Sequence, residues 1–189
     1  DDRTPMKKVC VLNMKGGVAK TTTAIHLAAG LAREGHRVLL IDSDPQGNVG
    51  HGFGVSISPP TIREVLLGEC RPEDAIVAMI RERLDFLPAT PSAFGVERQL
   101  ADEARPEASL TRRLAPVAGY DTVVIDTSPS MSLLTFNALL YADALVIPVA
   151  MDQMSIIGAR QTMNGVQEVH QLWPDRRLEV LAVVPTFVN

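Results

Sequence analysis

The sequence is poor in cysteine and in long apolar runs, and each shortage excludes a class of protein. The 189 residues include two cysteines, Cys10 and Cys70, which lie far apart in the chain. A disulfide framework, a zinc site or an iron–sulfur cluster needs more thiols at closer spacing, so we expect none of these and a reducing, cytoplasmic environment. No apolar run approaches the roughly 18 residues of a membrane-spanning helix, and residues 1–10 lack the pattern of a secretory signal.

An excess of basic charge is also missing. The chain has 18 lysines and arginines against 22 aspartates and glutamates, a net charge of −4, whereas a constitutive nucleic-acid-binding domain is usually basic. Lysine itself is scarce, because only four of the 18 basic residues are lysines. Two of the four, Lys15 and Lys20, lie in one short glycine-containing loop. The rigid guanidinium of arginine is no substitute for a flexible ammonium group, so this pairing indicates a specific need for lysine in the loop.

The main pattern of the chain is an alternation of apolar runs with helical segments. Runs without polar alternation are typical of parallel strands that are covered on both faces. They occupy residues 8–13, 37–42, 84–87, 122–126, 144–149 and 178–184. Helical spacing is found in residues 21–34, 132–141 and 155–173. We therefore predict one doubly wound α/β domain over residues 1–189, with a mostly parallel sheet flanked by helices.

The middle of the chain, residues 56–119, is less regular and richer in proline and charge. Thr61 and Glu64 have the spacing of a capping box, which predicts that a helix begins there. Pro72 is placed to open a second helix. Apart from the run at residues 84–87, the pattern predicts no further element in this region.

The loop after the first predicted strand has the composition of a phosphate-binding loop. Residues 13–22 read Asn-Met-Lys-Gly-Gly-Val-Ala-Lys-Thr-Thr. A glycine-rich turn points backbone N–H groups at an anion, and the helix that follows adds its partial positive charge. Lys20 would reach the β- and γ-phosphates, and the Thr21 hydroxyl would hold Mg²⁺. The strict pattern Gly-x-x-x-x-Gly-Lys-Ser/Thr has Met14 and Ala19 at its glycine positions here, so the loop alone is also compatible with a glycine turn before an ordinary helix.

Acidic residues stand at the ends of two other predicted strands. Asp42 and Asp44 follow the run at 37–42, and Asp126 ends the run at 122–126. Taken singly, Asp44 before a proline is a turn signal and Asp126 is a common end to a strand. Because the carboxyl ends of parallel strands meet at one edge of a sheet, we expect these carboxylates beside the phosphate loop. Carboxylates suit hydrated Mg²⁺, so the combination predicts a magnesium–nucleotide site.

These segments resemble the deviant Walker A ATPases of the ParA/MinD group. Residues 15–22 are similar to the phosphate loop of that group, and residues 42–48 to its first switch segment. Residues 120–130 resemble its Walker B strand and second switch. The run Asp-Pro-Gln-Gly-Asn at residues 44–48 is closer to ParA-type partition ATPases than to MinD. The resemblance covers nearly the whole chain and implies the P-loop NTPase fold.

The resemblance implies a role for each matching residue. Lys20 would bind phosphate, and Lys15 would be the signature lysine that reaches the partner's nucleotide across a dimer interface. Asp44 would position or activate the attacking water, so Lys15, Lys20 and Asp44 form the implied catalytic set. The implied nucleotide contacts are Lys15, Gly16, Gly17, Val18, Ala19, Lys20, Thr21 and Thr22, with Pro185 and Asn189 near the adenine. The implied magnesium contacts are Thr21, Asp42, Asp44 and Asp126.

The resemblance also implies a function and its partners. An ATPase of this kind uses ATP and Mg²⁺, forms a homodimer on binding ATP and turns over slowly until a centromere-binding or other partner protein stimulates it. It would bind DNA non-specifically in its ATP state and act in plasmid or chromosome partition, in the cytoplasm and on the nucleoid of a bacterium or archaeon. The alternatives are a MinD-like or cargo-positioning ATPase on a membrane surface or protein cargo, and a metabolic kinase or cluster-bearing reductase of the same superfamily. The sequence has no basic amphipathic tail for the former and no paired cysteines for a reductase.

The chain departs from the family pattern at three places. Ala19 stands where the family more often has glycine, which costs about 1 kcal/mol or more if φ is positive there and nothing if φ is negative. Ser128 replaces a proline frequent in the second switch, which would loosen that loop. Relatives continue past the strand that ends near Pro185, so either the sequence is a piece of a longer protein or the family's last segment is absent. Because that segment often carries the basic residues for DNA, the DNA face of this chain is left open.

Overall fold

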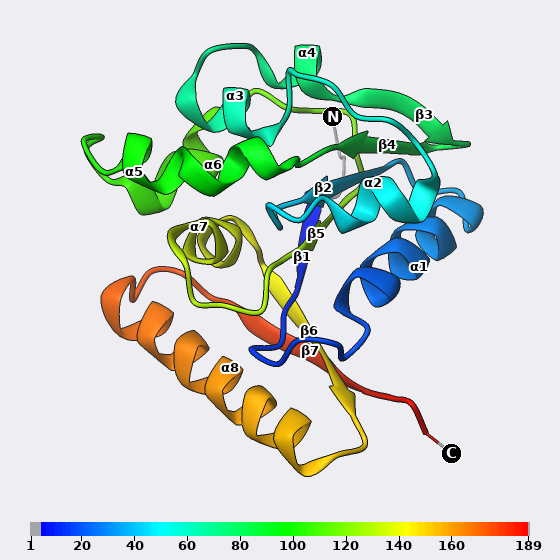
Figure 1. Ribbon diagram of the computed structural model, residues 1–189, viewed down its shortest axis with the longest axis vertical. Coiled ribbons are helices and arrows are strands. Elements are labelled where there is room, and N and C mark those ends of the chain that lie inside the picture. The colour runs from blue at the N-terminus through cyan, green and yellow to red at the C-terminus, as the bar shows by residue number, and fades with distance from the viewer. Residues whose placement is uncertain (1–4, 189) are drawn as a thin grey trace.

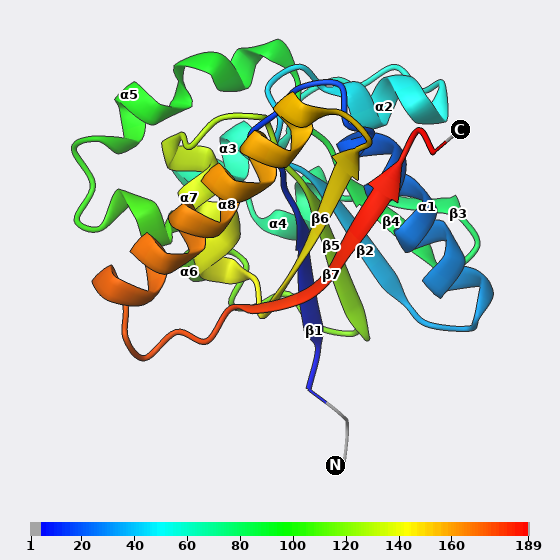
Figure 2. The same ribbon diagram turned by 90° about the horizontal axis from the view of Figure 1, so that it is seen from below.

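The computed structural model describes residues 5–188 and is built on a seven-stranded sheet with the order β3-β4-β2-β5-β1-β6-β7. Neighbouring strands are parallel except β3 and β4, which form an antiparallel pair at one edge. Figure 2 shows β6 and β7 running side by side in the same direction. The strands are β1 (Lys7–Val11), β2 (Val38–Asp42), β3 (Val77–Arg81), β4 (Leu84–Leu87), β5 (Thr122–Asp126), β6 (Ala144–Ala150) and β7 (Glu179–Thr186).

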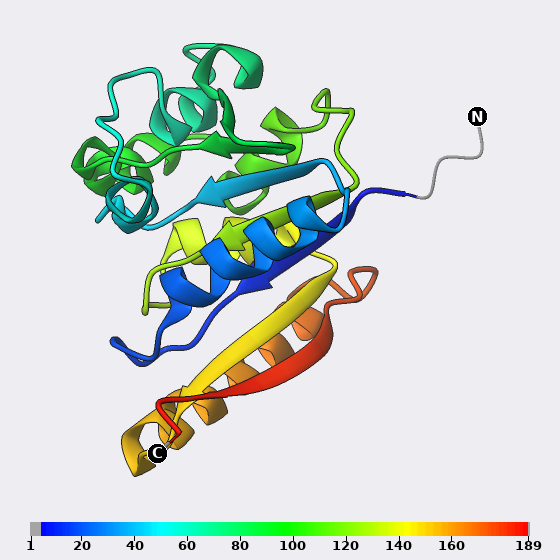
Figure 3. The same ribbon diagram turned by 90° about the vertical axis from the view of Figure 1, so that its right-hand side faces the viewer.

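Helices cover both faces of the sheet, as the doubly wound pattern predicts (Figure 1). Helices α1 and α2 pack on one face, and Figure 3 shows α1 lying along it. The other face is covered by α7 and α8 together with the short helices of the middle region. The helices are α1 (Lys20–Arg33), α2 (Asn48–Phe53), α3 (Ile62–Leu67), α4 (Pro72–Ala75), α5 (Val96–Leu100), α6 (Ser109–Arg113), α7 (Leu133–Tyr141) and α8 (Gln153–Leu172), with 3₁₀ turns η1 (Pro91–Gly95) and η2 (Pro106–Ala108).

Burial follows the apolar runs closely in the centre of the sheet. Every residue of β2, β5 and β6 is buried, which confirms that these strands are covered on both faces. Strand β7 differs, because Leu181 and Val183 are 55% and 58% exposed. It lies at the edge of the sheet, and no helix among residues 5–188 covers its outer face.

The irregular middle region contains the two predicted helix starts. Thr61 caps α3, and its hydroxyl accepts a hydrogen bond from the backbone N–H of Arg63, while Glu64 accepts one from the N–H of Thr61 at 2.7 Å. Pro72 stands in the first turn of α4. The pattern missed β3, α2, α5 and α6, which are five or six residues long, and the three helices are too short for a hydrophobic period to be read.

The register of the strands brings the predicted site together. Residue Asp126 at the end of β5 pairs with Val11 of β1 on one side and with Asp42 of β2 on the other. The loops that follow these three strands therefore leave the sheet side by side. In the part of the chain that the structure describes, no helix is long and apolar enough to cross a membrane.

Candidate nucleotide site

The phosphate loop joins β1 to α1 and has two residues with left-handed backbone. Gly17 has φ +75°, and Ala19, which precedes the helix, has φ 65° and ψ 33°. Ala19 offers no side-chain hydrogen bond to the first turn of α1, and that turn contains no acidic residue. Within residues 5–188, no side chain therefore caps the first N–H groups of the helix or balances its positive dipole end, and this arrangement binds an anion.

A hollow of about 330 Å³ lies in front of these N–H groups. Six of the sequence-predicted phosphate residues meet there with Asp44 from the loop after β2, whereas the exposed Lys15 and the buried Val18 do not line the hollow. Three further lining residues, Gln46, Asn48 and Pro129, were not among the predicted contacts, although they belong to the segments that carried the resemblance. The lining consists of Gly16, Gly17, Ala19, Lys20, Thr21, Thr22, Asp44, Gln46, Asn48 and Pro129.

Lys20 is buried at the mouth of the loop. Its Nζ donates a hydrogen bond to the carbonyl oxygen of Lys15 at 2.9 Å, so the ammonium group is held across the loop. Burial lowers the pKa of Lys20, while the nearby carboxylates of Asp126 and Asp44 raise it. A partly desolvated ammonium beside open N–H groups favours an anionic ligand at this point.

Asp126 is fully buried, and neither of its carboxylate oxygens has a hydrogen-bond partner among residues 5–188. Burial raises the pKa of Asp126 to about 7; the nearby Thr21 hydroxyl and Lys20 ammonium oppose this rise, and Asp44 adds to it. Buried polar atoms are nearly always paired, so two unpaired oxygens beside a hydroxyl call for an external partner. Oxygen ligands of this kind fit Mg²⁺.

A cation here would take few ligands from the protein itself. Across residues 5–188, no three His, Cys, Asp or Glu side chains converge on one metal position. Mg²⁺ commonly keeps several waters and takes one or two protein oxygens together with phosphate oxygens. Two of the predicted magnesium contacts, Thr21 and Asp126, therefore suit a bound Mg²⁺. Water and the nucleotide would supply its remaining ligands.

Asp42 lies beside Asp126 in the sheet but has other contacts. Its two oxygens accept hydrogen bonds from the backbone N–H groups of Asp44 at 3.0 Å and Val49 at 3.2 Å. Burial, then the charge of Asp126, raises the pKa of Asp42 well above its usual range. Both oxygens thus hold the loop and the start of α2 in place. The magnesium contact implied for Asp42 stays a prediction, and this geometry gives it a positioning role.

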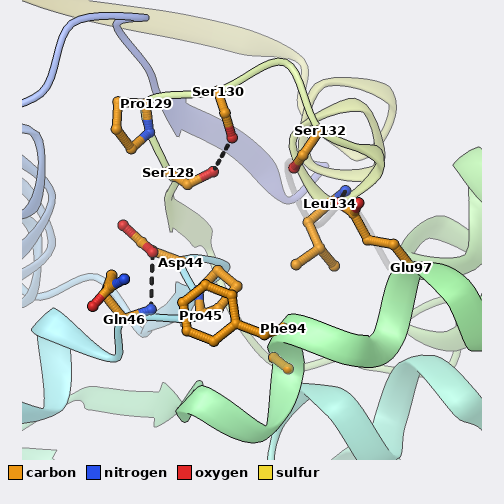
Figure 4. Close-up of a pocket in the computed structure, with 11 residues that line it drawn as sticks. Asp44, Pro45, Gln46, Phe94, Glu97, Ser128, Pro129, Ser130, Ser132 and Leu134 are labelled. Carbon is orange, nitrogen blue, oxygen red and sulfur yellow. Dashed lines mark hydrogen bonds between the residues drawn. The ribbon is translucent and has the colours of Figure 1, made fainter.

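Asp44 lines both the phosphate hollow and a second cavity of about 360 Å³, and the second cavity is drawn in Figure 4. One of its oxygens accepts a hydrogen bond from the N–H of Gln46 at 2.9 Å, and Figure 4 shows its carboxylate between Gln46 and Ser128. The second cavity is bounded by the loop at 44–46, the loop after β5 and the segment at 93–97. Because no motif marks residues 93–97, sequence reasoning could not have placed them here.

The predicted adenine contacts are only partly described. Pro185 is exposed in β7, and Asn189 lies outside the described residues. The neighbouring Thr186 hydroxyl donates a hydrogen bond to the carbonyl oxygen of Val18 at 3.2 Å. The end of β7 is therefore tied to the phosphate loop, while the base contact of Pro185 stays a prediction.

Comparison with known proteins decides the family. A family model described as an AAA domain matches residues 6–180. The chromosome partitioning protein ParA of Caulobacter vibrioides is 40% identical over 191 residues, which cover 98% of this chain and 71% of that protein. The chain belongs to the ParA/Soj family of partitioning ATPases. The ParA of Myxococcus xanthus is 41% identical over 175 residues, 90% of this chain, and this family member spans only 62% of that relative's length.

Solved structures of relatives have the same architecture. A protein from Mycobacterium smegmatis, described as cobyrinic acid a,c-diamide synthase with bound ATP analog and magnesium, superposes with a TM-score of 0.89 at 37% identity. The match covers 96% of this chain and 75% of that one. The predicted α/β fold with a mostly parallel sheet is thus confirmed as that of a ParA-family P-loop protein, and a relative with this fold holds the predicted pair of ligands.

Proposed function

We propose that this chain binds and hydrolyses ATP with Mg²⁺ as a ParA-type switch in chromosome or plasmid partition. The observation that carries the proposal is the buried carboxylate of Asp126, which has two unpaired oxygens beside Thr21 and Lys20 and in front of an uncapped helix. A magnesium–triphosphate supplies the cation that Asp126 lacks and the anion that the helix start lacks. The named partition relatives support the biological setting.

Each residue of the site then has a defined task in hydrolysis. The N–H groups of the loop and the ammonium of Lys20 would bind the β- and γ-phosphates, and Thr21 and Asp126 would hold a hydrated Mg²⁺, whose chemistry when bound is to neutralise phosphate charge. Asp44 orients a water molecule whose oxygen bonds to the γ-phosphorus as the bond to the β,γ-bridging oxygen breaks. The proton of that water passes to Asp44, and the products are ADP and phosphate.

Lys15 is the residue that connects hydrolysis to dimerisation in this proposal. Its side chain is exposed at the surface beside the phosphate loop and forms no ion pair within 4.0 Å in the described part of the chain. An unpaired ammonium at this place can complete the charge neutralisation of a second subunit's nucleotide. Turnover would stay slow until a second copy and a stimulating partner protein bring the groups together.

The DNA part of the proposal concerns the arginines. Arg112 and Arg113 both bind Glu103, and Arg176 donates to the carbonyl oxygen of Ala142, so these arginines have protein partners. Arg81 and Arg83 are exposed and make no ion pair within residues 5–188, although each donates a hydrogen bond to a backbone carbonyl oxygen. Other exposed arginines without an ion pair in this range include Arg33, Arg98, Arg160 and Arg177. Non-specific DNA binding in the ATP state would use such exposed arginines, and a dimer would double their number.

The experiment compares wild type with Lys20→Ala, using Asp102→Asn as a matched surface control. We expect Lys20→Ala to weaken binding of a fluorescent ATP analogue with Mg²⁺ by about a hundredfold or more, because the loop loses its phosphate ammonium. Unchanged affinity in that variant would refute the phosphate site. Binding to random-sequence duplex DNA, measured by anisotropy at fixed salt without nucleotide, with ADP and with ATP, then tests the partition switch.

Each outcome of the DNA measurement has a meaning. Binding only with ATP supports the ParA-type switch. ATP-dependent binding to anionic lipid vesicles instead of DNA supports the MinD-like alternative. ATP hydrolysis that requires a carboxylic acid and an amine donor, with no response to DNA, supports a metabolic synthase such as the one named for the M. smegmatis relative.

A further inference from the structure

Helix α8 carries two buried glycines, Gly158 and Gly165, two turns apart on one face. A Cβ at Gly158 would lie 2.5 Å from Oδ1 of Asn13 and 2.7 Å from Cβ of Lys15. A Cβ at Gly165 would clash with the end of the Met131 side chain. The helix therefore has one notch that receives the phosphate loop and another that receives the segment after β5.

Hydrogen bonds join the first notch to the backbone of the phosphate loop. The N–H of Met14 donates to Oγ1 of Thr162 at 3.1 Å, and that buried hydroxyl donates in turn to the carbonyl oxygen of Gly158 at 2.9 Å. The N–H of Lys15 donates to Oδ1 of Asn13 at 2.9 Å, and the Asn13 amide donates to the carbonyl oxygen of Pro148 at 2.7 Å. The two peptides before the Lys15 side chain are thus fixed by α8 and β6.

The peptide that follows Lys15 binds the second lysine. Its carbonyl oxygen, that of Lys15, accepts a hydrogen bond from Nζ of Lys20 at 2.9 Å, so a shift of the Lys15 backbone moves both ammonium groups. At the start of α8, hydrogen bonds from Ser155 hold the pKa of Asp152 below its usual range, and the nearby charge of Lys15 lowers it further. Backbone and side chain of Lys15 are both within reach of the first half of α8.

We propose that Thr162 and Gly158 are positioning residues for Lys15, and that α8 links Lys15 to the segment after β5 through Met131 in the second notch. This inference rests on the proposed function of Lys15 in hydrolysis. A rigid helix separates the two notches by about 10 Å, at 1.5 Å per residue. A displacement of Met131 is therefore passed to Thr162 and the Lys15 peptide instead of being absorbed locally.

The first test replaces the hydroxyl without changing the volume. Thr162→Val removes the acceptor of the Met14 N–H, whereas Thr162→Ser keeps it. We expect Thr162→Val to lower the kcat of ATP hydrolysis about tenfold with the affinity for ATP within about twofold, and Thr162→Ser to stay within about twofold of wild type in both. In a Lys15→Ala background, Thr162→Val should add no further loss, because it acts through Lys15.

Two results would overturn this inference: an equal effect of Thr162→Val with and without Lys15, or a kcat unchanged by Thr162→Val. If wild-type protein neither binds nor hydrolyses ATP, the result counts against the proposed function and not against the positioning role of Thr162. A measurement that does not depend on hydrolysis separates a failure of this inference from a failure of the proposed function. Hydrogen exchange of the peptide covering residues 12–16 should be faster in Thr162→Val than in Thr162→Ser, whatever the ATPase rate.

The second test addresses the link to Met131. Gly165→Ala fills the second notch, and Gly30→Ala in α1 is the matched control, because a Cβ there meets nothing within 4 Å. Gly165→Ala should speed hydrogen exchange in residues 127–132 and also in residues 12–16, while Gly30→Ala changes neither. Faster exchange confined to residues 127–132 would refute the coupling.

Discussion

Ala19 illustrates how a single backbone angle decides whether a residue destabilises the folded protein. The sequence permits two outcomes for an alanine at this glycine-favoured position, and the structure gives it the left-handed backbone with φ 65°. No pattern in the sequence determines that angle, because it follows from how the loop must turn its N–H groups toward the hollow. Asp126 is a second case: its position at a strand end is predictable, but the absence of hydrogen-bond partners for its carboxylate among residues 5–188 is not.

Ala19→Gly should stabilise the protein. The left-handed conformation costs an L-residue about 1–2 kcal/mol, and glycine's extra freedom in the unfolded chain takes back about 0.4–1 kcal/mol, so a gain of about 0.5–1 kcal/mol remains. Ala29→Gly within α1 is the control and should lose about 1 kcal/mol. Urea unfolding measures both, and a loss at Ala19 equal to that at Ala29 would contradict the strained conformation.

Asp126→Asn should separate stability from ligand binding. Removing a buried charge without a partner should raise the free energy of unfolding of the ligand-free protein by about 1 kcal/mol at pH 8. The same change should abolish the part of ADP stabilisation that depends on Mg²⁺, measured as the difference in Tm between ADP with Mg²⁺ and ADP with EDTA. Asp102→Asn, at an exposed position, should keep that difference; a difference retained in Asp126→Asn would exclude Asp126 from the metal site.

At the scale of single elements, sequence and structure agree where an element is long or fully buried. The runs at 122–126 and 84–87 have the bounds of β5 and β4, and the predicted helix at 21–34 is shifted by one residue from α1. The short helices α2, α5 and α6 fail to appear in the pattern because their five or six residues span less than two turns. Strand β3 is missed because it is an exposed edge strand, so its residues need not form the apolar run that marks a buried strand.

The capping box of α3 gives a prediction at this scale. Thr61→Ala should cost about 1 kcal/mol, because it removes the hydroxyl that accepts from Arg63 and binds Glu64. Burial opposes ionisation of Glu64, but hydrogen bonds from Thr61 and Arg63 outweigh it and lower the pKa of Glu64. A lowered folded pKa means that this stabilisation is present above the unfolded value of about 4.3 and is lost as pH falls through the folded value.

The measurement is urea unfolding of wild type and Thr61→Ala at pH 7 and at acid pH. The difference between the two proteins should shrink as Glu64 becomes protonated. Thr111→Ala, at an exposed position in α6, is the control and should show a small difference that does not depend on pH. A Thr61→Ala cost that is constant with pH would rule out the ionised capping box.

For the whole molecule, the meeting of the phosphate loop with Asp44 and Asp126 follows from sheet topology and could be predicted. Parallel strands place their carboxyl ends at one edge, and the pairing of Val11, Asp126 and Asp42 fixes the order. The second cavity could not be predicted, because residues 93–97 reach it through packing of segments distant in sequence. Likewise, the notches of α8 depend on a tertiary fit that no motif encodes.

The shared position of Asp44 predicts how nucleotide changes the molecule as a whole. Magnesium with a slowly hydrolysed ATP analogue should slow hydrogen exchange in three separate segments, residues 12–22, 43–49 and 127–132, because one ligand contacts or orders them all. The exposed edge strand β3 serves as the internal reference and should be unaffected. Protection limited to residues 12–22 would show that the two switch segments do not respond to nucleotide.

The first turn of α1 lacks a capping side chain, and a ligand can supply what is missing. Helices α3, α7 and α8 obtain a side-chain acceptor for their first N–H groups from their own chain, namely Thr61, Ser132 and Asp152. Helix α1 has no such residue. A bound phosphate would take the place of the missing capping residue, so that the nucleotide acts as a structural part of the helix whose presence or loss the rest of the protein can sense.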